Sequence, residues 1–167
     1  MTGLTKLDEP ETARSTDTSP DSAGRLLALD LGARRVGVAV SDELRITVNP
    51  LPAIERRSWK DLLRRVAAII ESYDAQGLVI GLPLSLMGAE GSAAQEARAT
   101  AGKFQQSLPV PVYLQDERLT TVAATEQLKA AGRSASEIEN QVDSESATII
   151  LRDFIAHNAH RNLVTQT

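Results

Sequence analysis

Acidic residues stand at three places where a chain of this pattern could bring carboxylates together. Asp30 ends the apolar run LLALD, Asp116 and Glu117 follow the run VPVYLQ, and Asp143 precedes the stretch SESATIIL. A buried carboxylate without a partner is costly, so acids at such positions require a hydrogen bond, a basic neighbour or a cation. Mg²⁺ and Mn²⁺ prefer oxygen ligands, and two such ions about 3.5–4 Å apart can cleave a phosphodiester by activating water and stabilising the leaving oxygen. The pattern therefore indicates metal-dependent phosphodiester chemistry.

Taken singly, each acid also has an ordinary explanation. Asp30 could form an ion pair with Arg34 or Arg35, and the two acids after VPVYLQ could be a turn and a solvated pair. Asp143 could be a residue at a helix N-terminus that the helix dipole favours. Only the joint placement of the acids favours the metal site, and the spacing does not choose between the two acids that follow VPVYLQ.

Helical periodicity predicts which face of the last helix carries Asp143. Apolar residues follow it at the spacing of one helix face: Ala147, Ile150, Leu151 and Phe154. A residue four positions before Ala147 shares that face, so Asp143 heads the stripe that packs on the rest of the domain. Glu145 is rotated by about 200° from Asp143 and is expected to face water.

The elements that must position these acids follow from hydrophobic patterning. We expect strands at 26–31, 36–42, 46–54, 77–83 and 110–115, and helices at 58–73, 92–108, 122–132 and 142–157. Short turns between the first three strands predict antiparallel pairing, and the later alternation of strands and helices predicts parallel crossovers. The fold class is therefore α/β, with a mixed five-stranded sheet flanked by helices, and the polar segment 133–141 is expected to be a link.

Length and composition predict one domain with an aliphatic core. The chain has 167 residues, of which 42% are hydrophobic and only 3% aromatic. We expect a disordered tail at 1–24, a domain at 25–157 and a C-terminal tail at 158–167. The absence of cysteine excludes thiolate metal sites and suits a reducing compartment, and no apolar run is long enough to span a membrane. A cytoplasmic location is therefore expected.

The basic residues could hold a polyanion, although the net charge is −4. The first 24 residues contain five acidic and two basic residues, so the rest of the chain carries a net charge of only −1. Candidate phosphate contacts lie beside the acids or on one face of the first helix: Arg34, Arg35, Arg118, Arg57, Lys60 and Arg64. With few aromatic residues for stacking, binding is expected to depend on backbone contacts and to be sensitive to salt.

Four segments in this order resemble a known family. They are LALDLGARRVGVAVSD, VIGLPLSLMGAEGSAAQEARATAGKF, DERLTTVAA and VDSESATIIL, which together are similar to the YqgF/RuvX family of ribonuclease H-like nucleases over residues 26–155. The resemblance implies a ribonuclease H-like fold and cytoplasmic phosphodiester hydrolysis with Mg²⁺ or Mn²⁺, with two ions expected. It also implies that Asp30, Glu117 and Asp143 are the catalytic and metal-binding acids, which selects Glu117 over Asp116.

The substrate implied by this resemblance is pre-16S rRNA, processed at its 5′ end, or a four-way DNA junction. A junction resolvase would need two active sites, so the sequence leaves a monomer and a homodimer open. Two other readings are a non-catalytic adaptor for nucleic acid or ribosome assembly, and an actin-like or sugar-kinase-like ATPase, for which the chain is too short. The chain differs from the family at Gln115, where an aromatic residue is usual, and in the weakly basic segment 133–141.

Overall fold

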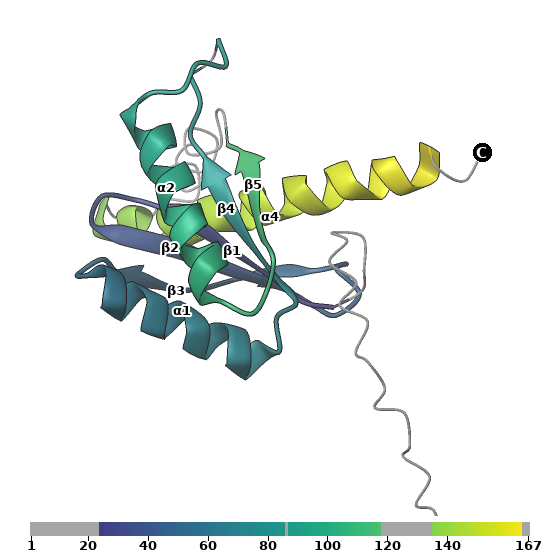
Figure 1. Cartoon of the computed structure of the whole chain (residues 1–167), viewed down its shortest axis with the longest axis horizontal. Helices are drawn as coiled ribbons and strands as arrows, with labels where there is room; N and C mark the ends of the chain where they lie inside the picture. The colour runs from purple at the N-terminus through teal and green to yellow at the C-terminus, as the bar shows by residue number, and fades with distance from the viewer. Residues whose placement is uncertain (1–23, 86, 118–134, 165–167) are drawn as a thin grey trace, which may run out of the picture.

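A computed structural model describes residues 24–85, 87–117 and 135–164, and in the last helix the side chains of residues 144–158 (Figure 1). The predicted helix at 122–132, Arg118 and the side chain of Asp143 lie outside the described parts, as does the predicted tail at 1–24 except for Gly24. Among the described residues, no helix combines the length and apolar character needed to cross a membrane.

Five strands and three helices make up the described fold. They are β1 (Leu26–Leu31), β2 (Arg35–Ser41), β3 (Val48–Glu55), α1 (Trp59–Tyr73), β4 (Gly77–Leu82), α2 (Ser92–Ser107), β5 (Val112–Asp116) and α4 (Ala135–Val164). The predicted elements that fall within the described residues are confirmed in type and order. Most of their boundaries are shifted by only one or two residues.

The strands form one mixed sheet in the order β3-β2-β1-β4-β5. Strands β1, β2 and β3 pair antiparallel, whereas β4 pairs parallel with β1 and with β5. This confirms the predicted antiparallel meander followed by parallel crossovers. Because β1, β4 and β5 run in the same direction, their carboxyl ends meet at one edge of the sheet.

Helices cover both faces of the sheet. Helices α1 and α2 lie on one face and α4 crosses the other (Figure 1). The α1 side buries the larger apolar cluster, which includes Leu62, Val66, Ile70, Leu78, Ile80 and Phe104. The α4 side buries a smaller cluster, which includes Leu26, Ala28, Ala39, Val79, Ile150 and Phe154. Successive residues along a strand alternate between these two faces. Whether a side chain packs on the α1 side or on the α4 side therefore depends on its position in this alternation.

Helix α1 begins at the edge of the sheet where the carboxyl ends of β1 and β4 lie. The Ser58 side chain accepts a hydrogen bond from the backbone N–H of Asp61 at 3.1 Å, which caps the first turn. At the other end, Asp74 takes a left-handed conformation with φ of 51° and ends the helix.

The last helix is longer than the periodicity predicts. Helix α4 begins at Ala135 rather than at residue 142, and it continues to Val164 rather than ending at 157. The segment 135–141, ASEIENQ, contains good helix formers and neither glycine nor proline, so the helix extends through the expected link. Asp143 therefore does not open the helix. It lies two turns inside, where the dipole of the N-terminus no longer explains its presence.

Candidate active site

Strand alternation directs Asp30 and Glu117 to the same face of the sheet. In β1, Leu26 and Ala28 pack in the cluster beneath α4, and Asp30 continues that alternation. In β5, Tyr113 packs against the same cluster, and Glu117 lies four residues further on. The backbone N–H of Glu117 donates to the carbonyl of Leu82 at 3.2 Å, so the β4–β5 ladder fixes its position just beyond Asp116. Both acids stand at the carboxyl edge of the parallel strands.

The Glu117 carboxyl group meets the Asp30 carboxylate directly. Burial raises the pKa of Glu117 to about 8, helped by the charge of Asp30, a hydrogen bond with Asp30 and the charge of Asp116. The Glu117 Oε2 atom is buried and has no hydrogen-bond partner among the described residues. At neutral pH the two carboxyl groups therefore share a proton in the absence of a cation, and one oxygen is left for a further ligand.

Gly81 provides the space in which the Glu117 carboxyl group lies. A Cβ atom placed on Gly81 would collide with Glu117 Oε2, and it would stand 2.6 Å from Cδ1 of Ile150 on α4. The carboxyl group is thus held between the backbone of β4 and a side chain of the last helix. Pattern analysis did not single out Gly81, although a glycine inside a buried strand is a known sign that another group approaches the backbone closely.

Asp116 contributes charge from the other side of the strand. Its neighbour in alternation, Leu114, packs in the clusters on the α1 and α2 side, so Asp116 is directed away from α4. Its proximity still contributes to the raised pKa of Glu117. Strand alternation thus directs Asp116 and Glu117 to opposite faces of the sheet, although their spacing in the sequence did not distinguish them.

Asp143 lies on the helix that covers this face. The backbone of α4 places it one turn before Ala147 and about two turns before Ile150, both of which pack against the sheet. Its side chain is outside the described residues. Nearby on α4, the buried Ser144 hydroxyl donates to the carbonyl of Leu51 in β3 at 2.7 Å, which ties this part of the helix to the sheet.

Arg56 joins three segments at the same edge, and the sequence analysis did not select it. Its backbone N–H donates to the carbonyl of Arg34 at 2.8 Å, and its guanidinium donates to the carbonyl of Gly32 at 3.0 Å. The guanidinium also pairs with Glu96 on α2. Arg56 thus fixes the turn that follows Asp30. The sequence signal was the adjacent pair Arg56–Arg57, which does not show which of the two faces inward.

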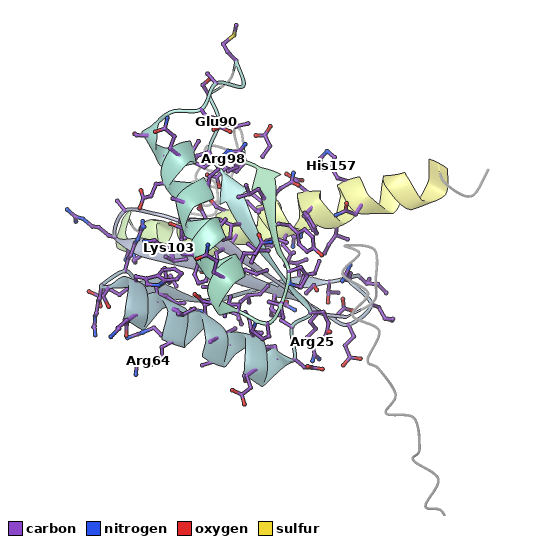
Figure 2. All side chains as sticks on the ribbon, in the orientation of Figure 1. Arg25, Arg64, Glu90, Arg98, Lys103 and His157 are labelled. Carbon is purple, nitrogen blue, oxygen red and sulfur yellow. The ribbon has the colours of Figure 1, made fainter. Side chains whose placement is uncertain are left out.

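The predicted phosphate contacts fall into two groups. Arg34 is exposed in the β1–β2 turn and Arg35 is half-buried at the start of β2, both close to the carboxyl edge. Arg118 is outside the described residues, and the other three belong to the region of α1, on the opposite side of the sheet from α4. Arg57 pairs with Glu55 at 3.0 Å, Arg64 pairs with Asp61 at 2.7 Å, and Lys60 is exposed. Figure 2 shows Arg64 on the outer surface of α1.

Two converging carboxyl groups fit a hard divalent cation. Both supply oxygen donors, their ionised forms repel each other, and Glu117 Oε2 has no partner among the described residues. The described side chains contain no cluster of three or more His, Asp or Glu residues able to hold a metal. The described part of the site therefore offers two candidate ligand groups, and a third would have to come from elsewhere, such as Asp143.

Comparison with known proteins shows which family this chain matches. Residues 24–157 match the family described as "RuvX: Holliday junction resolvase". A protein from Anaeromyxobacter sp. strain Fw109-5 named "Putative pre-16S rRNA nuclease" is 39% identical over 131 residues, which are 78% of this chain and 96% of that protein. A Synechococcus protein of the same name is 40% identical over 129 residues, 77% of this chain and 87% of that protein.

A solved structure shares the fold at low sequence identity. It is the Thermus thermophilus RuvC in complex with a Holliday junction substrate, with a TM-score of 0.51 and 13% identity. The alignment covers 80% of this chain and 94% of RuvC. The predicted ribonuclease H-like fold is confirmed.

Proposed function

The chain belongs to the RuvX family, and we propose that it is a divalent-metal-dependent nuclease that processes the 5′ end of pre-16S rRNA. Its curated relatives carry the name of a pre-16S rRNA nuclease. The observation that carries the proposal is the meeting of Asp30 and Glu117, which come from distant parts of the chain. Between β4 and α4, the Glu117 carboxyl group has a buried oxygen with no hydrogen-bond partner in the described part of the chain.

In this proposal Asp30, Glu117 and Asp143 hold Mg²⁺ or Mn²⁺, with two ions expected. The bound ions would supply Lewis acidity and lower the pKa of an attacking water. Glu117 must lose the proton that it shares with Asp30 before Oε2 can act as a ligand. Without a cation, ionising both carboxyl groups is therefore costly in free energy. A bound cation would offset this cost.

We assign substrate binding to the basic residues at the carboxyl edge of the sheet. Arg34 and Arg35 follow Asp30 by four and five positions, and Arg118 follows Glu117 directly. Arginine contacts to phosphate position a nucleic acid without reading its sequence. Lys60 and Arg64 on α1, with Arg57 just before this helix, would extend this surface. The folded structure of the rRNA precursor would then provide the specificity.

Cleavage assays with defined substrates test the proposal. The full chain is incubated with a pre-16S rRNA fragment that carries its 5′ extension, with Mg²⁺, with Mn²⁺ or with a chelator. We expect metal-dependent cleavage, and a loss of about 100-fold or more for Asp30→Asn, because a ligand oxygen is removed. The variant should remain folded or become more stable, since its like-charge repulsion falls.

The matched control is Asp74→Asn, because Asp74 is exposed at the far end of α1 in a left-handed conformation that asparagine tolerates. This variant should cleave at the rate of the unchanged chain. Undiminished cleavage by Asp30→Asn, or cleavage that persists in chelator, would rule out the metal mechanism. A complete absence of cleavage with every substrate and metal would favour the adaptor reading.

Junction resolution is the second candidate, favoured by the description of the family itself. A resolvase must cut two strands at symmetric positions, which requires two copies of the site related by a two-fold axis. Four-way DNA junctions in the same assay, together with the mass of the chain in solution, separate the candidates. Paired symmetric nicks by a dimer would select the resolvase, and cleavage restricted to the rRNA precursor would select the rRNA nuclease.

A further inference from the structure

We propose that Gly81 is a positioning residue for Glu117: its lack of a side chain opens the path by which the Glu117 carboxyl group crosses β4 to reach Asp30. This inference deepens the proposed function, because it concerns the same pair of acids. It also stands on the packing of the protein without any cation, so it can be tested separately.

The strand order makes a crossing necessary. Asp30 is in β1 and Glu117 follows β5, and β4 lies between these two strands. Neighbouring strands are about 4.8 Å apart, so the two backbones are about 10 Å apart at this level. The Glu117 side chain nevertheless interacts with Asp30. It must therefore pass over the backbone of β4 on the side that faces α4.

The residue at the crossing point is Gly81. Leu29 pairs with Ile80, so Asp30 is level with Gly81, and Gly81 in turn pairs with Gln115 of β5. Gly81 also follows Val79 by two positions, and Val79 packs in the α4-side cluster, so both positions face the same side. A Cβ atom at Gly81 would occupy the place of Glu117 Oε2 and would contact Cδ1 of Ile150 at 2.6 Å. Even alanine would therefore force the carboxyl end of Glu117, and the end of the Ile150 side chain, to move from these positions.

Backbone conformation does not account for this glycine. Positive φ angles among the described glycines occur at Gly24 and Gly88, and Gly81 is in an ordinary strand region that any residue adopts. Glycine inside a strand weakens the strand, so its presence here calls for a gain elsewhere. The gain is the position of Glu117. The same geometry explains the acid at 117, because aspartate is one methylene shorter and would not extend as far over β4.

The first test compares Gly81→Ala with Gly102→Ala. Gly102 is on α2, and a Cβ there would meet nothing within 4 Å, so its replacement should be neutral or slightly stabilising. Mn²⁺ affinity is measured by titration calorimetry and folding by thermal melts. We expect Gly81→Ala to weaken Mn²⁺ binding by about tenfold or more, as outer partners of metal ligands do, while Gly102→Ala binds as the unchanged chain does. Unchanged Mn²⁺ affinity in folded Gly81→Ala would overturn the proposal.

A second variant separates positioning from simple packing. Ile150→Val removes the Cδ1 atom that an alanine at 81 would contact, but it does not remove the conflict with Glu117. The double variant Gly81→Ala/Ile150→Val should therefore regain part of its melting temperature and still bind Mn²⁺ weakly. Recovery of Mn²⁺ affinity together with the melting temperature would show that Gly81 serves packing only, and would overturn the assignment.

A cycle without metal distinguishes failure of this inference from failure of the proposed function. In chelator, Gly81→Ala should lower the melting temperature by about 3 °C or more. It should lower it by clearly less in the background of Glu117→Ala, where no carboxyl group competes for the space. Equal losses in both backgrounds would refute the positioning role. If the unchanged chain does not bind Mn²⁺ but the losses differ, the nuclease proposal fails and the positioning role stands.

Discussion

The two faces of the sheet differ in the size of their apolar clusters and in the polar groups that they bury. The face covered by α1 and α2 buries large apolar side chains that include Leu62, Val66, Ile70 and Phe104. The face covered by α4 also buries large apolar side chains such as Leu26, Ile150 and Leu151, and it adds buried hydroxyl groups from α4: Ser144, Ser146 and Thr148. It also holds the Asp30–Glu117 pair. Both faces thus contribute apolar burial, of which the α1 and α2 face has the larger cluster, and the α4 face also holds buried polar groups.

The two faces also differ in how buried polar side-chain atoms without a hydrogen-bond partner are compensated. On the α4 side, Glu117 Oε2 and Ser146 Oγ are buried and have no hydrogen-bond partner among the described residues. On the α1 side, Asp61 Oδ2 and Arg65 Nε are also buried without a hydrogen bond, but these two atoms form an ion pair 3.0 Å apart, and Arg64 pairs with Asp61 at 2.7 Å. A buried polar atom without a partner costs free energy, and an ion pair offsets that cost for Asp61 and Arg65. Among the described residues, the buried polar atoms that lack both a hydrogen bond and an ion pair therefore lie on the α4 side.

The largest expected effect on stability lies on the α1 and α2 face. Phe104 is fully buried and packs edge-on against Trp59, with ring centroids 4.8 Å apart. Phe104→Ala should lower the free energy of unfolding by about 3–5 kcal/mol, measured by urea denaturation. The milder Phe104→Leu should lose less. In both variants, Mn²⁺ affinity per folded molecule should be unchanged. A parallel loss of Mn²⁺ affinity at temperatures where the variants are folded would contradict the division of labour between the faces.

The next effect is a pH dependence that originates on the α4 face. Glu117 has a pKa of about 8 in the folded protein against an ordinary value of 4.5. The folded state therefore keeps a proton that the unfolded chain has lost between these two values. Without divalent ions, the free energy of unfolding should be highest at low pH and should fall as pH rises through this window, by at most about 1.4 kcal/mol per pH unit.

Glu117→Gln should flatten this dependence, because glutamine does not titrate. The exposed Glu71→Gln is the matched control and should keep the slope. The measurement is urea denaturation in chelator from pH 5 to pH 8. A slope that survives in Glu117→Gln would show that another group is responsible.

The smallest effects concern the basic residues of the two faces. Arg34 is exposed at the carboxyl edge, whereas Arg64 is on the outer surface of α1 and already pairs with Asp61. Arg34→Gln should reduce the dependence of RNA affinity on salt by about 0.7–0.9 in the logarithmic slope, the value for one phosphate contact. Arg64→Gln should reduce it by less. A larger change for Arg64→Gln than for Arg34→Gln in filter-binding assays would indicate that the RNA binds along α1.

Much of this arrangement could be predicted from the sequence, because the strands have strong patterns. The run LLALD and the stripe from Ala147 to Phe154 determine which residues face the core, and both predictions are confirmed. The start of α4 was misplaced because ASEIENQ has no apolar period, although its residues favour helix. A polar helix segment and a polar link have the same hydrophobic pattern.

The details of the site depend on relations between strands that the sequence does not contain. Which strands neighbour each other, and in what register, determines that Gly81 lies between Asp30 and Glu117. Likewise, the sequence marks Arg56 and Arg57 as equivalent, and only the packed structure shows that Arg56 holds the turn after Asp30. The roles of Asp30, Glu117 and Asp143 in catalysis remain predictions.

We propose that Asp30 and Glu117 share a divalent cation in place of a proton. A calorimetric titration of the chain with Mn²⁺ at pH 7, repeated in buffers with different heats of ionisation, tests this exchange. We predict that binding releases about one proton per chain from the pair, and that Glu117→Gln loses both the release and most of the affinity. Binding without proton release, or equal Mn²⁺ affinity in Glu117→Gln, would contradict the account.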